Sequence, residues 1–177
     1  MARPRSDTKA RAQAVARELF REQGLQRTSL QDIADRLGVS KPALYYHFAS
    51  REDLVRSVVE PLFHAGRTFV AQAEQGAMTP RELLAGYFEF QYRHRDVVEL
   101  MVQELTSLRE LGLLDQVWEW RRRLGALLVG PEPTLVDEVR ATVALGGLAD
   151  LVMTFPEASY DELCAAGVDA ACAALGI

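Results

Sequence analysis

A lysine, two tyrosines and a histidine, all able to donate hydrogen bonds, lie close together in the stretch GVSKPALYYHF, which runs from Gly38 to Phe48. Lys41 is positively charged, and Tyr45, Tyr46 and His47 are rings with polar tips. Such groups can donate to phosphate oxygens, and a lysine can also bond the O6 or N7 acceptor of guanine. The chemistry indicated is recognition of a polyanion, without any bond made or broken.

Three helices are expected to position this stretch, of which the second and third are short. The first is predicted from about Ser6 to Gln23, with one apolar face and Gly24 as its C-terminal stop. The second should begin at Thr28 or Ser29, with Asp32 completing the cap signature, and end at Gly38. The inward positions of these two helices are Ala12, Ala16, Leu19 and Phe20, then Ile33, Ala34 and Leu37.

The third helix is predicted to be capped by Ser40, with Lys41, Pro42 and Ala43 in its first turn. Leu44 and Phe48, four residues apart, should face inward. Two short helices joined by a glycine-containing turn form a helix-turn-helix, whose second helix enters the major groove of DNA. We therefore predict a helix-turn-helix DNA-binding domain over residues 1–50.

The rest of the chain shows helical periodicity and no strand signal, so the fold class predicted is all-α. A connecting helix is expected over 51–75, kinked at Pro61, followed by a larger helical domain over 76–177 for effector binding and dimerisation. The predicted helices of that domain span 80–94, 96–108, 113–129, 134–153 and 159–175. The last two are rich in Ala and Gly, which suits close packing within the chain or in a four-helix bundle between two chains.

Charge divides the chain in the same way as the motifs do. Residues 1–50 hold nine Lys/Arg against five Asp/Glu, a net of +4, while the other 127 residues hold eleven against twenty, a net of −9. A basic N-terminal third on an acidic body predicts a polyanion partner for that third alone. The chain contains no apolar run long enough to cross a bilayer, so we expect no membrane partner and a cytoplasmic location.

These residues resemble the tetracycline-repressor (TetR) family of bacterial transcriptional regulators. The resemblance covers roughly residues 8–56 and rests on positions that agree in order and spacing: Gly24, Thr28, Ile33, Ala34, Gly38, Val39, Ser40, Leu44, Tyr45, Phe48, Arg51 and Leu54. It implies an obligate homodimer, formed here through the last two helices, that reads a palindromic operator in double-stranded DNA. It also implies a pocket for a small-molecule effector in each C-terminal domain.

The resemblance also implies roles for individual residues. Lys41, Pro42 and Tyr45 would approach bases, with Ala43 beside them in the first turn. Thr28, Ser40, Tyr46, His47 and Arg51 would contact phosphates. Arg3 and Arg5 form a basic arm ahead of the first helix that would reach a groove or the backbone.

Candidates for an effector pocket come from composition alone, since such pockets are apolar and aromatic with a few polar groups. They are His64, Phe88, Tyr92, Met101, Trp118, Arg121 and Phe155, although a residue of these types taken singly is more often ordinary core. The basic run Arg121 to Arg123 suits a solvated face or an interface better than a second nucleic-acid site.

The sequence thus predicts a sequence-specific DNA-binding regulator, a repressor released from its operator by a small-molecule ligand. Activation stays open, because the sign of regulation depends on where the operator lies. Two rival classes are an all-helical carrier protein and a helical enzyme. Against an enzyme, the three histidines have no metal-site spacing, and no nucleophile motif or phosphate-binding glycine loop is present, so we expect no catalysis, metal or cofactor.

Overall fold

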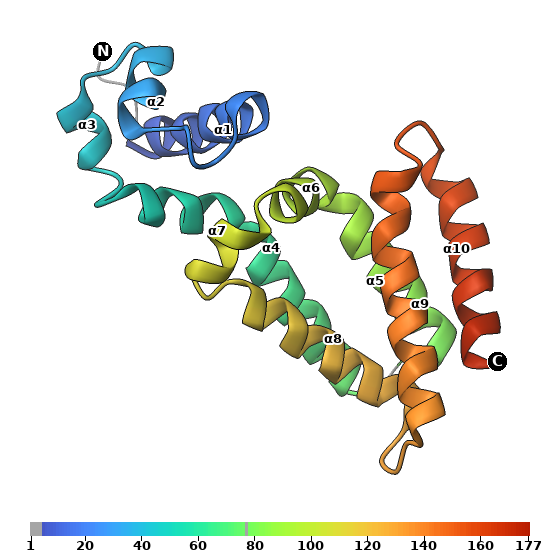
Figure 1. The fold of residues 1–177 in the computed structure, drawn as a ribbon. Coiled ribbons are helices and arrows are strands. Elements are labelled where there is room, and N and C mark those ends of the chain that lie inside the picture. Colours follow the sequence, from blue (N-terminus) through green and yellow to red (C-terminus); the bar gives the residue numbers. More distant parts are fainter. Residues whose placement is uncertain (1–4, 77) are drawn as a thin grey trace. The chain divides into compact units, whose positions relative to one another are not determined.

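The computed structural model describes residues 5–76 and 78–177, and within these ranges every regular element is a helix. The ten helices are shown in Figure 1. They are α1 (Arg5–Gln23), α2 (Leu30–Leu37), α3 (Lys41–Tyr45), α4 (Arg51–Glu74), α5 (Pro80–Arg93), α6 (Arg95–Gln103), α7 (Leu105–Glu110), α8 (Leu114–Val129), α9 (Leu135–Thr154) and α10 (Tyr160–Leu175). The all-α prediction is confirmed.

Several helix ends follow directly from capping residues that the sequence displays. Ser29, Thr79 and Thr134 each form a capping box with the acidic residue three positions later, which satisfies backbone donors at the starts of α2, α5 and α9. Gly38 ends α2 with a φ of 67°, in the left-handed region where a side chain would be strained. Ser40 is the N-cap residue of α3, as predicted, but its side chain makes no cap hydrogen bond.

The predicted helix over 96–108 is wrong as a single element. It is divided at Glu104, whose φ of −117° and ψ of 29° lie outside the helical region. The Glu104 carboxylate accepts a hydrogen bond of 2.7 Å from the backbone N–H of Leu25, a residue 79 positions away. This long-range contact accompanies the interruption, and helical periodicity alone gave no sign of it.

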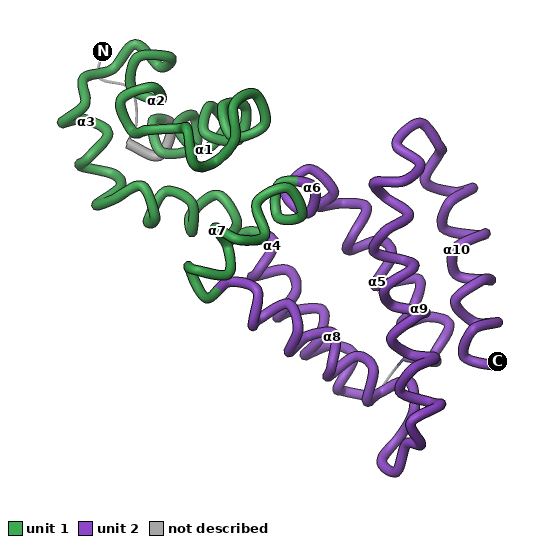
Figure 2. The backbone as a smooth tube through the Cα atoms, viewed as in Figure 1, with its two compact units in different colours: residues 1–61, 100–112 green, residues 62–99, 113–177 purple. Residues whose placement is uncertain are grey.

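The chain forms two compact units, coloured separately in Figure 2. The first, here called the head, contains residues 1–61 and 100–112, and the second, the body, contains residues 62–99 and 113–177. The chain therefore passes between them three times, within α4, within α6 and after Gly112. The functional boundaries predicted at 50 and 75 stay a prediction, since compactness does not assign function.

Each unit has its own apolar core. In the head, the predicted face of α1 is fully buried, as are Ile33, Leu44 and Phe48. In the body, α9 packs on α10, α8 and α5, and α5 also packs on α10. Glycines allow close approach there: a Cβ on Gly66 of α4 would lie 2.6 Å from the Trp120 ring of α8.

Candidate nucleic-acid interface

The stretch from Ser40 to Phe48 separates into buried and exposed residues. Leu44 and Phe48 are 0% and 1% exposed, and they fix α3 and the turn after it to the head's core. Ser40, Lys41, Pro42, Ala43, Tyr45 and Tyr46 are exposed, while His47 is half-buried. The exposed residues and His47 are called the recognition strip below.

Contacts within the recognition strip orient its polar groups. The Lys41 ammonium lies 5.8 Å from the centroid of the Tyr45 ring, one helical turn along α3. The Tyr46 and His47 rings meet edge to face at a centroid distance of 5.4 Å. Because α3 ends at Tyr45, Tyr46 and His47 lie in the following turn and not on the helix as predicted.

Lys9 of α1 is a basic residue that the sequence interpretation did not select. Its ammonium lies 6.0 Å from the centroid of the Phe48 ring, while Lys9 itself is exposed. It thus adds a positive charge beside the end of the recognition strip. The signal that could have found it is the basic N-terminal third, but only the fold brings position 9 next to position 48.

Thr28 and Arg51 do not fit their predicted phosphate contacts. Thr28 is 2% exposed, and its hydroxyl donates to the Gly24 carbonyl at 2.9 Å. Arg51 is half-buried and its guanidinium donates to the Thr28 carbonyl at 2.9 Å and to the Leu25 carbonyl. Both side chains instead hold the turn between α1 and α2, which positions the helix-turn-helix.

The α6–α7 segment contributes polar contacts to the same turn. Besides accepting from Leu25, Glu104 accepts from the Ser107 hydroxyl at 3.1 Å through its other carboxylate oxygen. The Ser107 hydroxyl in turn accepts from the Gln26 side chain at 2.8 Å. Glu104 and Ser107 were not selected from the sequence, since nothing local in residues 100–112 indicates a partner 80 positions earlier.

The basic arm is only partly covered by the structure. Arg3 lies outside the described residues. Arg5 is the first residue of α1, so it belongs to the helix and does not precede it as predicted.

The seven candidate effector residues do not gather in one place. Met101 belongs to the head and the other six to the body. Phe88 is fully buried in an aromatic cluster with Tyr92 and Tyr160, His64 is exposed, and Phe155 is half exposed. Burial in that cluster is the main cause that raises the pKa of Tyr160 to about 12, and a hydrogen bond with Cys164 is the second cause. Besides Phe88 and Tyr92, a second pair of candidates, Trp118 and Arg121, lies together, and both line a hollow between α8 and α9.

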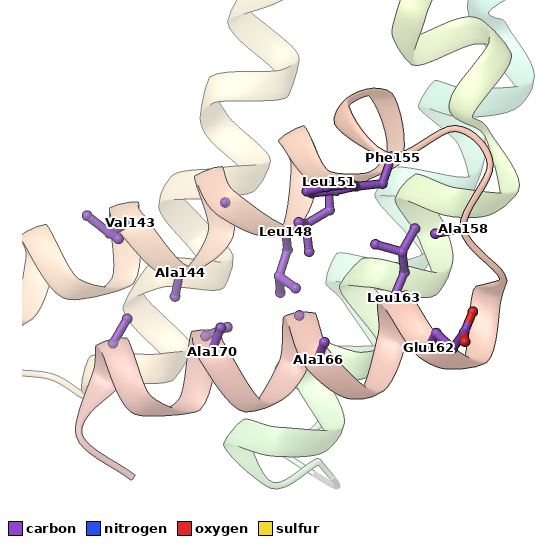
Figure 3. A pocket seen from close by; sticks show the side chains of 14 residues that line it. Val143, Ala144, Leu148, Leu151, Phe155, Ala158, Glu162, Leu163, Ala166 and Ala170 are labelled. Atoms are coloured by element: carbon purple, nitrogen blue, oxygen red, sulfur yellow. The ribbon is translucent and has the colours of Figure 1, made fainter.

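A second hollow lies between α9 and α10, with a volume of about 460 Å³ (Figure 3). Leu148, Leu151, Phe155 and Leu163 project into it, and the remaining wall is mostly alanine and glycine. Val136, Val139 and Val143 of α9 are all more than half exposed, at 57%, 52% and 58%. The exposed valines and the hollow together make the surface of α9 and α10 unusually apolar for helices that contact solvent in a single chain.

Comparison with known proteins agrees with the geometry of the head. The family model for bacterial regulatory proteins of the tetR family matches residues 14–58, from α1 to the first half of α4. The head therefore carries the sequence pattern of the TetR family over these residues. The transcriptional repressor KstR2 of Mycolicibacterium smegmatis is 32% identical over 108 residues, which cover 58% of this chain and 52% of that protein. The activator FasR of the same organism is 39% identical over 57 residues, covering 32% and 26%.

Solved structures match this chain over more of its length. A transcriptional regulator from Aquifex aeolicus VF5 is 28% identical with a TM-score of 0.76, covering 92% of this chain and 96% of the other. A TetR-like regulator from Rhodococcus sp. RHA1 shares the fold, with a TM-score of 0.77 at 19% identity and 99% of both chains covered. By contrast, the chain spans between 36% and 52% of the length of the first curated relatives.

Other classes of site find no support in the described residues. They contain no group of three or more His, Cys, Asp or Glu placed to hold a metal ion. Helices with enough length and apolar character to cross a bilayer are also missing from the described ranges. The matched curated relatives quoted above are named as regulators of transcription, which is not an enzymatic role.

Proposed function

We propose that this chain is a homodimeric, sequence-specific DNA-binding regulator of transcription. The observation that carries the proposal is the recognition strip. It presents Lys41 and Tyr45 on the exposed side of α3, while Leu44 on the helix and Phe48 after it anchor the segment to the core. The family model covers this region, so the exposed face corresponds to the second helix of a helix-turn-helix. Lys41, Pro42, Ala43 and Tyr45 read bases, and Ser40, Tyr46 and His47, with Lys9, contact phosphates.

Dimerisation is proposed through α9 and α10. The exposed valines of α9 and the apolar hollow beside them support this, because a second copy of the face would remove the surface from water. Two heads held in a fixed relation then read two half-sites, so the operator is palindromic. Val143→Lys should shift the chain toward monomer in sedimentation. Leu127→Lys on α8 is the control, because it makes the same apolar-to-charged change at a residue that is 40% exposed, and it should leave the dimer intact.

The regulator is proposed to be a repressor that a small-molecule effector releases from DNA. The name of the repressor KstR2 supports this sign, while that of the activator FasR supports the opposite one. If the effector favours a conformation unsuited to the operator, effector binding lowers the affinity for the operator. Operator binding then lowers the affinity for the effector by the same factor. A reporter gene placed behind the selected operator decides the sign, since deleting the regulator raises expression under repression and lowers it under activation.

The decisive experiment selects duplex fragments from random DNA with the purified protein, then measures their affinity over a range of salt. We expect affinity to fall steeply as salt rises, because released counterions set that slope. A carrier protein would show no selected sequence and no such slope. Lys41→Ala should weaken binding by about tenfold to a hundredfold and relax one base position in each half-site, since a lysine–guanine contact is worth about 1–3 kcal/mol.

Arg36→Ala is the matched control. It also removes one positive charge from the head, but Arg36 pairs with Glu22 at 3.0 Å and lies on α2, outside the recognition strip. Its effect should be small and equal for all sequences. Equal affinity and unchanged base preference in Lys41→Ala would remove the base-reading role from Lys41.

A further inference from the structure

Three consecutive arginines on α8 have different surroundings. Arg122 pairs with Glu119, with Nη2 2.8 Å from Oε1, and Arg123 pairs with Glu74, with Nε 2.7 Å from Oε1. Both pairs use two donor nitrogens of the guanidinium. Arg121, by contrast, pairs with no carboxylate among the residues that the structure describes, although it is half-buried.

Arg121 lies in the hollow between α8 and α9, whose volume is about 480 Å³. Cavities of about 300–1,000 Å³ are the usual size for small organic ligands. Gly125, Ala126 and Ala141 form part of the wall, and their small side chains leave the space open. The hollow is therefore large enough for a ligand with one or two rings.

Two neighbours hold the Arg121 side chain in place. Its guanidinium carbon lies 5.6 Å from the ring centroid of Trp118, a cation–π contact that leaves the N–H edges available. On α9, a Cβ at Gly146 would lie only 3.0 Å from Arg121 Nη2, so the missing side chain makes room for the guanidinium. The guanidinium is thus positioned before any ligand arrives.

Glu138 also lines the hollow, but it lies two turns before Gly146 on α9, about 12 Å along the helix axis at 1.5 Å per residue. Its carboxylate does not neutralise Arg121. A planar guanidinium with free N–H groups matches the two oxygens of a carboxylate in a bidentate pair. A ligand that supplies this carboxylate would give Arg121 the kind of partner that Arg122 and Arg123 already have.

We propose that the hollow between α8 and α9 binds an aromatic carboxylate, with the carboxylate paired to Arg121 and the ring system against Trp118 and the small wall residues. This inference rests on the proposed function, because it names the chemical class of the effector. An uncharged ligand of the same shape would leave Arg121 without an anion, so the site discriminates by charge.

The test is calorimetric titration of the full chain with 1-naphthaleneacetate and with 1-naphthaleneacetamide, which has nearly the same shape and no charge. The wild-type protein should bind the acid at least about tenfold more tightly than the amide, as expected for a charge-assisted hydrogen-bonded pair. Arg121→Met, which keeps the apolar stem, should abolish that preference. Arg121→Lys should retain part of it, because the charge stays and the bidentate geometry is lost.

Arg123→Met is the matched control, because Arg123 lies on the same helix, is equally charged and half-buried, but is already paired with Glu74 and does not line the hollow. It should leave the preference for the acid unchanged. Circular dichroism and thermal unfolding check that each variant is folded. Equal binding of acid and amide, no binding of the acid, or an equal loss in the two methionine variants would each overturn the proposal.

A DNA-binding assay on the same samples separates this inference from the proposed function. Salt-dependent binding to a selected operator, together with no Arg121-dependent binding of the acid, would overturn the inference alone. Arg121-dependent binding of the acid by a chain that selects no DNA would support the site and overturn the regulatory function. If both stand, the acid should lower the affinity for the operator in the wild-type protein and not in Arg121→Met.

Discussion

The contacts within the head differ in kind from the close helix contacts within the body. In the head, directional hydrogen bonds join distant segments: Arg51 donates to carbonyls of the α1–α2 turn, and Glu104 accepts from Leu25. In the body, helices approach closely at glycines, such as Gly66 against Trp120 and Gly167 against Leu151. Hydrogen bonds to the backbone fix the orientation of a reading surface, whereas in the body the packing beside α9 is incomplete and leaves hollows of about 460 and 480 Å³.

The largest loss of stability is expected from removing a buried ring, and comparing one such ring in each unit tests whether the body is as firmly packed as the head. Phe88 in the body and Phe20 in the head are both essentially unexposed. Truncating either to alanine should lower the free energy of unfolding by about 3–5 kcal/mol, measured by urea denaturation. A much smaller cost for Phe88→Ala would mean that the body, unlike the head, can collapse around the missing ring.

Glu104→Ala tests whether the hydrogen bonds between distant segments stabilise the head. It leaves the Leu25 N–H without its acceptor, so unfolding should become about 1–3 kcal/mol easier. Glu110→Ala, at the exposed end of α7, removes the same charge from the same segment and should change little. Equal stability of the two variants in urea would show that the hydrogen bond does not help to hold the head.

Gly167→Ala tests the close packing of α9 on α10. The added Cβ would lie 2.5 Å from Leu151 Cδ1, so the variant should be destabilised by about 1 kcal/mol or more in thermal unfolding. Gly125→Ala is the control, because its nearest neighbour would be 3.9 Å away. Alanine is the better helix former, so Gly125→Ala should be stabilised by up to about 1 kcal/mol. A change in stability of the same sign in both variants would contradict the close packing of α9 on α10 at Gly167.

Ser29→Ala should have the smallest effect, about 1 kcal/mol at pH 7, through loss of the α2 cap. Hydrogen bonds from the Ser29 backbone N–H, and then from its hydroxyl, lower the pKa of Asp32. A lowered pKa gives stability that is present above the unfolded value of about 3.9 and is lost as the pH falls through the folded value. The gap between the variant and wild type should therefore narrow below pH 4, measured by urea denaturation across pH, and a constant gap would exclude Asp32 from the cap.

Local signals in the sequence predicted much of the fold. The cap at Ser29 and the glycine stop at Gly38 were correct, because each depends on residues within four positions. The inward face of α1 was also correct, since helical periodicity reveals it. The division at Glu104 was missed because its hydrogen-bond partner is 79 positions away.

The same limit applies to the candidate sites. A resemblance assigns residues by position in a motif, so it placed Thr28 and Arg51 at phosphates when their side chains hold the α1–α2 turn. Composition selected seven effector residues, but only the packing of α8 on α9 shows that Trp118 and Arg121 share a hollow. Their partner Gly146 carries no chemistry of its own, and its role is to leave space.

The three crossings of the chain between the units set a rule for building hybrid regulators. A DNA-reading module cut at residue 61 and joined to another body would lack residues 100–112, and with them the acceptor for the Leu25 N–H. The transplanted module would also lose the Arg56 contact with the Leu111 carbonyl at 2.7 Å. Exchange of operator specificity should therefore succeed when both segments are moved together, or when only the recognition strip is replaced in place.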